Sequence, residues 1–235
     1  MSMKRLSAAL LLCVLTMCAQ GLWASAFAWA HLNSGGSGMV AGTITLGAQM
    51  INVTYTSSDL YFWQINDMGT DWWSGGACGG PCPVYNDPIA GISPPDTVDM
   101  IALVGNSNMH TLTFSTPVTN PVLAIISLGQ PSVHTTYYFD HPFTILTSGG
   151  GWWGGGSLAT VTGNGLQGTE GDGLVEFVGT YSEISWTGAI PEAWNGFNVG
   201  SFASSSTIPE PASMVLLGTG LLGIAGVMRS KRSKR

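Results

Sequence analysis

The sequence predicts an all-β protein, built as an antiparallel β-sandwich with a jelly-roll-like arrangement of strands. No stretch between residues 31 and 203 sustains a helical hydrophobic period, whereas many short segments alternate apolar and polar residues or form apolar runs. Glycine accounts for 33 of the 235 residues and, with proline and asparagine, separates these segments at short intervals. Short strands separated by turn residues in this way are typical of β-sandwiches.

The expected strands differ in how they are buried. Apolar residues alternate along 49–56, which predicts a strand with one buried and one solvated face. The segment 122–128 is apolar almost throughout, which predicts burial on both faces. Two glycine-rich stretches, 66–95 and 148–156, are expected to be loops. The full set of expected strands is 49–56, 60–65, 98–104, 110–115, 122–128, 133–139, 143–147, 158–162, 174–178, 182–187 and 195–199.

The first thirty residues have the pattern of a secretory signal peptide. Lys4 and Arg5 form a positive start, and the stretch from Leu6 to Ala19 is apolar and short. An uncleaved membrane anchor is the alternative, but this apolar run is short for a membrane span. Small residues at suitable spacing predict cleavage after one of three positions, which are Ala26, Ala28 and Ala30.

The last residues combine three features in a fixed order. Pro209, Glu210 and Pro211 form an extended segment, because each proline fixes its own φ and keeps the preceding residue out of the helical region. An uncharged run from Ala212 to Met228 follows, which as a helix would reach about 25 Å, near the lower limit for crossing a bilayer. A basic tail over 229–235 would hold that end on the cytoplasmic side.

This C-terminal pattern resembles the PEP-CTERM sorting signal of exported bacterial proteins. The resemblance implies that an exosortase-type transpeptidase recognises Pro209, Glu210 and Pro211, and that the C-terminal helix tethers the chain to the membrane only until processing. It further implies export through the inner membrane and delivery to the cell surface or the extracellular matrix. The chain then divides into a signal peptide (1–30), an exported β-sandwich domain (31–203), a linker (204–208) and the sorting signal (209–235).

Charge is distributed very unevenly along the chain. All seven Lys and Arg residues belong to the two terminal signals, so residues 31–208 contain no basic side chain other than histidine. The same segment carries twelve acidic residues and a formal charge of −12. Nucleic-acid binding and attachment to anionic lipids both need cations, and Schiff-base chemistry needs a lysine. The composition therefore excludes these functions for the exported domain.

Two cysteines remain in the exported domain, Cys78 and Cys82, with three residues between them. Export to an oxidising compartment predicts that they form a disulfide. A redox-active pair normally has two intervening residues, and a zinc site would need two more ligands close by. Neither alternative finds support in the local sequence.

Acidic side chains gather in two glycine-containing loops. Asp67 and Asp71 belong to the first loop, and Glu170 and Asp172 belong to the second. Flexible loops rich in oxygen ligands suit calcium, and a bound cation would relieve the repulsion between carboxylates in a domain without Lys or Arg. The alternative is that these residues are solvated acids in turns.

Tandem tryptophans occur twice beside glycine-rich segments, as Trp72–Trp73 and Trp152–Trp153. Neighbouring residues on a strand point to opposite faces, so one ring of each pair can pack inward while the other faces outward. An exposed indole is a platform on which sugar rings stack. The alternative is that these rings fill the core beneath the loops.

The sequence thus favours an exported, non-enzymatic structural protein of the cell surface or of an exopolysaccharide-containing biofilm matrix. A carbohydrate-binding module, with or without calcium, is the second hypothesis. A secreted glycoside hydrolase is the third, although nothing in the spacing of the acids selects a catalytic pair.

Overall fold

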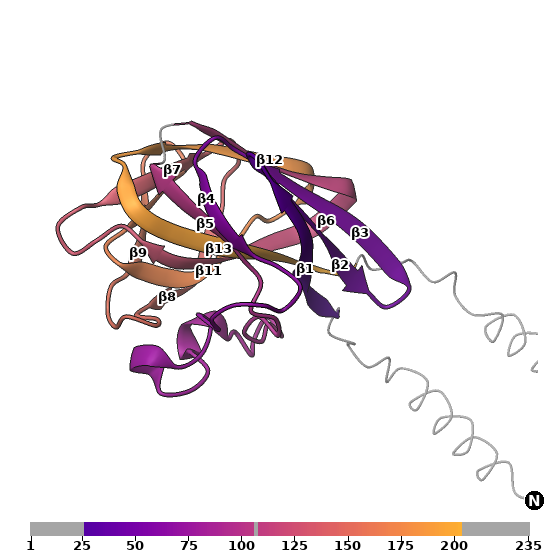
Figure 1. Ribbon diagram of the computed structural model, residues 1–235, viewed down its shortest axis with the longest axis horizontal. Helices are drawn as coiled ribbons and strands as arrows, with labels where there is room; N and C mark the ends of the chain where they lie inside the picture. The colour runs from indigo at the N-terminus through magenta and orange to yellow at the C-terminus, as the bar shows by residue number, and fades with distance from the viewer. Residues whose placement is uncertain (1–25, 106–107, 204–235) are drawn as a thin grey trace, which may run out of the picture. The chain divides into compact units, whose positions relative to one another are not determined.

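The computed structural model describes residues 26–105 and 108–203, which form one antiparallel strand system with two short 3₁₀ helices (Figure 1). No α-helix occurs among these residues, so the prediction of an all-β fold is confirmed. The helices are η1 (Gly76–Cys78) and η2 (Pro83–Tyr85). The strands are β1 (Phe27–Gly36), β2 (Met39–Leu46), β3 (Gln49–Thr56), β4 (Leu60–Gln64), β5 (Met100–Gly105), β6 (Met109–Leu128), β7 (Thr135–Phe139), β8 (Thr144–Gly149), β9 (Leu158–Val161), β10 (Gly165–Gly168), β11 (Gly171–Glu176), β12 (Thr180–Ala189) and β13 (Glu192–Phe202).

Five of these strands close into a barrel. The order runs β13, β1, β2, β3 and β6, and β6 pairs back with β13. Closure is achieved because β6 is long enough to pair with β3 near its start and with β13 toward its end. The expected jelly-roll-like sandwich is therefore not confirmed, and the architecture is a closed barrel with additional strands.

Strand β6 is one continuous strand of 20 residues where the sequence predicts two. Pro117 and Pro121 lie between the expected segments, and proline cannot donate to a strand ladder, which is why an interruption is predicted. The strand instead changes partners around them: β3 and β12 pair with its first half, and β11 and β13 pair with its second half. Asn120 has a positive φ of 48°, and its side chain accepts a hydrogen bond from the Gly179 N–H at 2.9 Å.

The remaining strands extend the barrel in three directions. Strands β5 and β4 continue from β13, strands β12, β7, β10 and β9 continue from the first half of β6, and β11 and β8 continue from its second half. Three observed strands, β1, β2 and β10, are absent from the predicted set. Each contains glycine, which interrupts the apolar alternation from which strands are predicted.

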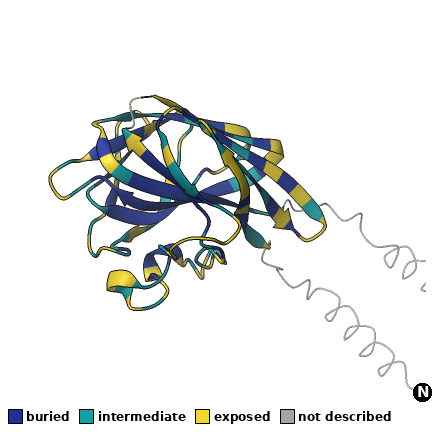
Figure 2. Cartoon of the chain, viewed as in Figure 1, coloured by how far each residue is buried: buried dark blue, intermediate teal, exposed yellow. Residues whose placement is uncertain are grey.

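Buried residues run along the central strands (Figure 2). Their side chains form two groups on opposite faces of these strands. Along β6, Leu123 and Ile125 belong to one group, while Ala124 and Ile126 belong to the other. We call the first group, inside the barrel, the inner core. The second group, which we call the outer layer, packs the opposite face against the long loop 66–95. From that loop it includes Trp73, Cys82, Val84, Tyr85 and Ile92.

The N-terminal strand starts inside the segment expected to be a signal peptide. β1 begins at Phe27, whereas the signal peptide is expected to span 1–30. Trp29 is 4% exposed, and its Nε1 donates a hydrogen bond to the Ser93 carbonyl oxygen at 2.9 Å. Of the three expected cleavage positions, only cleavage after Ala26 leaves β1 whole.

Several expected features lie outside the described residues. These are most of the signal peptide, the linker 204–208, and the sorting signal with Pro209, Glu210 and Pro211. Within 26–105 and 108–203, the structure contains no helix of sufficient length and apolar character to cross a membrane.

Candidate functional site

Four tryptophans from three separate parts of the chain form one aromatic cluster. Trp72 follows β4, Trp152 and Trp153 lie between β8 and β9, and Trp194 lies on β13. The Trp72 ring stacks on Trp153, with centroids 5.0 Å apart and planes at 22°. Trp153 meets Trp194 edge to face at 4.9 Å, and Trp72 meets Trp152 edge to face at 5.1 Å. These distances fall in the range preferred by aromatic pairs, so the rings hold one another in place.

Glycines in the long loop allow it to dock on the tryptophan-bearing loop. A Cβ at Gly76 would lie 2.3 Å from the carbonyl oxygen of Trp152, and a Cβ at Gly75 would lie 2.9 Å from the Trp152 ring. Both glycines have positive φ, a conformation that other residues adopt only with strain. The Ala77 N–H then donates a hydrogen bond to the same Trp152 carbonyl oxygen at 2.7 Å. The local sequence of small residues therefore permits this close approach.

The expected disulfide lies in the same loop. The Sγ atoms of Cys78 and Cys82 are 2.05 Å apart, as predicted for an exported domain. The Cys82 N–H donates to the Trp73 carbonyl oxygen at 3.0 Å, and the Gly75 N–H donates to the Gly80 carbonyl oxygen at 2.7 Å. The disulfide thus closes a compact loop beside the tryptophan cluster.

A groove of about 350 Å³ opens beside two of the tryptophans, Trp153 and Trp194. Trp153 is 47% exposed although its ring stacks on Trp72, so part of the indole is accessible to a ligand. Glu170 also lines the groove, and the Ser127 Oγ donates a hydrogen bond to its Oε1 at 2.6 Å. We call this the tryptophan groove; its remaining lining residues are Gln130, Pro131 and Ala193.

Backbone conformation is unusual at the polar wall of the tryptophan groove. Ser127 and Glu170 both have positive φ, at 57° and 61°. Non-glycine residues in this region carry strain, which is frequent at ligand-binding sites. Ser127 lies on β6, and Glu170 directly precedes β11, the strand that pairs with β6 there. The sheet therefore fixes the position of the Glu170 carboxylate.

A buried carboxylate, that of Asp172, is hydrogen-bonded to the polar wall of the groove through Ser127. Asp172 is 1% exposed, and its Oδ1 accepts hydrogen bonds from the Tyr85 hydroxyl at 2.6 Å and from the Ser127 N–H at 3.1 Å. A Cβ at Gly151 would lie 2.5 Å from the Asp172 Cγ, so the loop bearing Trp152 packs directly on this carboxyl. Burial raises the pKa of Asp172 to about 7, although the two hydrogen bonds oppose the shift.

The structure separates the two members of each tryptophan pair. Trp73 is 1% exposed and packs edge to face on Tyr85, with centroids 5.1 Å apart, so it belongs to the outer layer. Trp72 and Trp152 are half-buried, and Trp153 is exposed. Trp194 completes the cluster, although the sequence offers only an isolated tryptophan there. No local pattern marks Trp194, because its neighbours are brought together by the pairing of β13 with β5 and of β5 with β4.

Among the described residues, no three of the four expected calcium ligands bring their oxygen atoms within 4.8 Å of one another. The Asp71 Oδ1 accepts a hydrogen bond from the Trp73 N–H at 3.0 Å, Glu170 lines the tryptophan groove, and Asp172 is buried beneath it. Asp67 instead approaches His31 and the buried Asp99. Among the described residues, these three form the single group of potential metal ligands whose donor atoms all lie within 4.8 Å of one another. Asp99 also accepts hydrogen bonds from two backbone N–H groups, which accounts for its burial.

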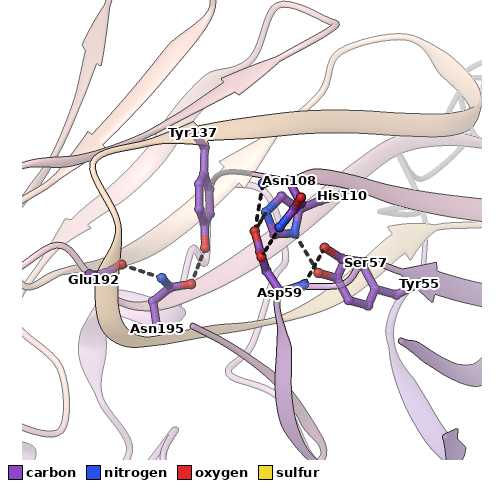
Figure 3. A network of polar contacts seen from close by, with 8 residues as sticks. All are labelled: Tyr55, Ser57, Asp59, Asn108, His110, Tyr137, Glu192 and Asn195. Atoms are coloured by element: carbon purple, nitrogen blue, oxygen red, sulfur yellow. Dashed lines mark hydrogen bonds and ion pairs between the residues drawn. The ribbon is translucent and has the colours of Figure 1, made fainter. Parts of the chain in front are cut away.

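A second polar cluster lies in the inner core (Figure 3). The Tyr55 hydroxyl is 2.7 Å from the His110 Nδ1, and the His110 Nε2 is 3.6 Å from the Asp59 Oδ2. The Asn108 N–H donates to that same Asp59 oxygen at 2.9 Å. A neutral His110 ring with its proton on Nε2 suits both neighbours. Burial lowers the pKa of His110 to about 4, with Asp59 opposing the shift, so the ring is neutral at pH 7.

This inner cluster is closed to large ligands. Trp186 stacks on His110 with centroids 5.2 Å apart and planes at 9°, and His110 itself is fully buried. Beside it, the Tyr137 hydroxyl donates to the Asn195 side-chain oxygen, and the Asn195 amide donates to Glu192. These bonds satisfy several polar groups inside the barrel, whereas the His110 Nε2 and the Trp186 Nε1 are buried without a hydrogen bond. Because the cluster is buried and most of its bonds join its own residues, we assign it a structural role.

Together, the barrel and the tryptophan groove define an all-β protein with a groove lined by aromatic and acidic side chains. Residues 207–232 match the PEP-CTERM protein-sorting motif, as predicted from the C-terminal pattern. The chain therefore carries a sorting motif that supports export and processing by an exosortase.

Comparison with other proteins adds little beyond this motif. No curated protein matches the chain. Two solved structures are similar to part of it: the catalytic domain of a GH87 α-1,3-glucanase in complex with nigerose, and a point variant of the same domain with the same ligand. Each similarity covers 49% of this chain and 24% of the other, at 14% identity and a TM-score of 0.22. A similarity this low carries no argument about function.

Proposed function

We propose that this protein is an exosortase-processed component of the cell surface or extracellular matrix that binds polysaccharide without cleaving it. Binding would take place in the tryptophan groove, and the ligand would be an exopolysaccharide of the biofilm matrix. The proposal unites two hypotheses from the sequence, a structural matrix protein and a carbohydrate-binding module. The sorting motif at residues 207–232 supports the delivery, and the groove supports the binding.

The observation that carries the proposal is an exposed indole beside an oriented carboxylate. The part of the Trp153 indole that Trp72 leaves exposed offers an apolar surface against which the C–H groups of a sugar ring can pack. Glu170 lines the same groove and accepts hydrogen bonds, as sugar hydroxyls require. The groove volume of about 350 Å³ lies within the roughly 300–1,000 Å³ range of small-ligand sites. An aromatic platform with few polar groups is the usual composition of such sites.

The same groove argues against glycoside hydrolysis. Both retaining and inverting glycosidases usually need two carboxyl groups facing the scissile bond. Glu170 is the one carboxylate among the described residues that line the groove, since Asp172 is 1% exposed beneath it. We therefore propose that the protein is not an enzyme. Incubation with the polysaccharide that it binds, followed by a reducing-sugar assay, should show no release of sugar ends.

Affinity electrophoresis tests the proposed binding. The mature protein is run in native gels that contain laminarin, dextran, hydroxyethylcellulose or alginate, and retardation measures binding. Trp153→Ala and Trp194→Ala should each abolish most of the retardation. Tyr138→Ala, which removes a 41% exposed ring outside the groove, should leave it unchanged. Equal retardation of all three variants and the wild type would refute the groove as the binding site.

Calcium dependence is tested in the same gels. Parallel gels with calcium and with EDTA distinguish a calcium-dependent module from a calcium-independent one. Because no three of the four expected calcium ligands gather among the described residues, we propose that retardation is the same in both. Loss of retardation in EDTA would restore the calcium-dependent alternative.

A further inference from the structure

A second and larger groove lies at the end of the barrel where β1 turns into β2 and β3 leads into β4. Its volume is about 710 Å³. Trp63 from β4 supplies the large aromatic side chain in this groove, and we call it the Trp63 groove. Hydroxyl side chains make up much of the rest of the lining, from Ser37, Thr56, Ser57, Ser58 and Thr111.

The indole of Trp63 lies against the backbone of β1. A Cβ at Gly35 would be 2.2 Å from the Trp63 Nε1, so any side chain at this position would displace the ring. Trp63 is partly buried and also packs against the inner core, so the ring is held from this side as well. The ring is therefore held in one place while lining an open groove, as an aromatic platform requires.

The two grooves lie on opposite sides of β4. Phe62, next to Trp63 in the chain, packs with the outer layer and stacks on Trp194, with centroids 6.1 Å apart. Trp63 packs with the inner core instead. This is the arrangement expected when successive side chains of a strand alternate between its faces. The grooves also share no lining residue.

The chemistry of the Trp63 groove selects an uncharged ligand rich in hydroxyl groups. None of its lining residues is ionisable, and each Ser or Thr hydroxyl can both donate and accept a hydrogen bond. The domain around it carries twelve acids and no Lys or Arg, so a polyanion would be repelled. Neutral polysaccharide combines the apolar C–H faces and the hydroxyl groups that suit this lining.

We propose that the Trp63 groove is a second carbohydrate-binding site, and that the two grooves together let one domain cross-link chains of neutral polysaccharide. The cross-linking role rests on the proposed function of the tryptophan groove, whereas binding at Trp63 does not. Two sites on one rigid domain gain avidity on a polymer because the second contact is made at high effective concentration. A matrix protein of this kind would gel polysaccharide as well as adhere to it.

The experiment uses the mature protein with soluble laminarin, dextran, hydroxyethylcellulose and the anionic alginate. Calorimetric titration measures the number of binding sites per protein. Light scattering measures cross-linking, because joined polysaccharide chains scatter more light. Trp63→Ala should halve the number of sites on the neutral polymer that binds and should remove the rise in scattering. Ser58→Trp, which fills the groove from an exposed position, should do the same without removing a packed ring. Tyr61→Ala, which removes a 58% exposed ring from the same strand, is the control and should change neither readout.

The outcomes separate the two proposals. If Trp63→Ala and Ser58→Trp both keep the full number of sites while Trp153→Ala reduces it, the Trp63 site is refuted and the proposed function stands. If Trp153→Ala changes nothing while the Trp63 groove variants abolish binding, the tryptophan groove and cross-linking are refuted and the Trp63 site stands. Binding of alginate in preference to every neutral polymer, or of none of the four, would overturn the assigned ligand class.

Discussion

The inner core and the outer layer share several strands, yet they are built in different ways. Inside the barrel, side chains from alternating strand positions meet one another, as with Val53 and Tyr55 on β3. In the outer layer, the opposite faces of these strands meet a loop of thirty residues without strands, which supplies Trp73 and Tyr85. The tryptophan groove borders the outer layer. The barrel core thus gives the fold its stability, while the docked loops shape the groove that is proposed to bind polysaccharide.

The largest expected effect is on stability, and it differs between Trp→Ala substitutions in the two regions. Trp186 is 1% exposed in the inner core, so Trp186→Ala should lower the free energy of unfolding by about 3–5 kcal/mol through the cavity it leaves. Trp152 is half-buried between two loops, and Trp152→Ala should cost about 1–2 kcal/mol while polysaccharide binding is lost. Urea unfolding followed by circular dichroism measures both. A greater loss of stability for Trp152→Ala would reverse the roles given to the two regions.

One ionisable group in each region makes stability depend on pH, with opposite signs. Burial lowers the pKa of His110 in the inner core from 6.5 to about 4, so only the unfolded chain gains a proton as pH falls through this window. The His110 contribution to the free energy of unfolding therefore decreases toward low pH. Burial raises the pKa of Asp172 in the outer layer from 3.8 to about 7, so only the unfolded chain loses a proton as pH rises. The Asp172 contribution therefore decreases toward high pH.

These two contributions offset each other between about pH 4 and 6.5. Asp172→Asn keeps the shape of the protonated side chain and removes its titration. The free energy of unfolding of this variant should gain on that of the wild type as pH rises from 4 to 7, by about 1.4 kcal/mol per pH unit. For His110→Gln, the free energy of unfolding should gain on that of the wild type as pH falls from 6.5 to 4. Urea titrations at five pH values give the free energy of unfolding as a function of pH for each protein. If the variants follow the same pH dependence as the wild type, the pKa values of these two groups are wrong.

Removal of the disulfide should affect the outer layer alone. Cys78 and Cys82 close a short loop, for which the chain-entropy effect on stability is about 2 kcal/mol. The double substitution to serine should lower the free energy of local unfolding of the outer layer by about this amount and weaken polysaccharide retardation, since the loop docks on Trp152. Hydrogen exchange should show faster exchange in 72–85 and unchanged exchange in β2 and β3. Faster exchange throughout the barrel would show that the two regions unfold together.

The smallest effect concerns where the mature chain starts. Trp29 belongs to the outer layer and Leu32 belongs to the inner core, so β1 serves both regions. Cleavage after Ala26 preserves the strand, whereas cleavage after Ala30 would remove Trp29 together with its bond to Ser93. Mass spectrometry of the exported protein should therefore identify Phe27 as its first residue. An N-terminus at His31 would show that β1 is shorter in the mature protein.

Much of the strand content could be predicted, because burial of one face leaves a period of two in the sequence. β3 has the predicted bounds, Gln49–Thr56. The barrel could not be predicted, because closure depends on which strands pair, and β6 appears from its prolines to be two strands. The sequence does not reveal β1, because its small residues also suit a cleavage site, nor β10, because two of its four residues are glycine.

Only those residues of the candidate site that a local pattern marks can be recognised from the sequence. Tandem tryptophans beside glycines mark Trp152 and Trp153 as unusual, and alternation suggests that one ring of each pair faces outward. Trp194 and Ser127 join the groove through pairings between distant strands, which no local pattern reveals. The acids were grouped by loop, but the structure places Asp172 beneath the groove and Glu170 on its wall.

The most direct test of this account is a calorimetric comparison of the wild type with Trp153→Ala, using the neutral polysaccharide that retards the wild type most. Trp153 is 47% exposed, so its removal should leave the urea midpoint nearly unchanged. We expect the affinity of the tryptophan groove to fall by at least tenfold, which corresponds to about 1.4 kcal/mol of binding free energy. An unchanged affinity in a fully folded Trp153→Ala variant would show that this groove does not bind the polysaccharide.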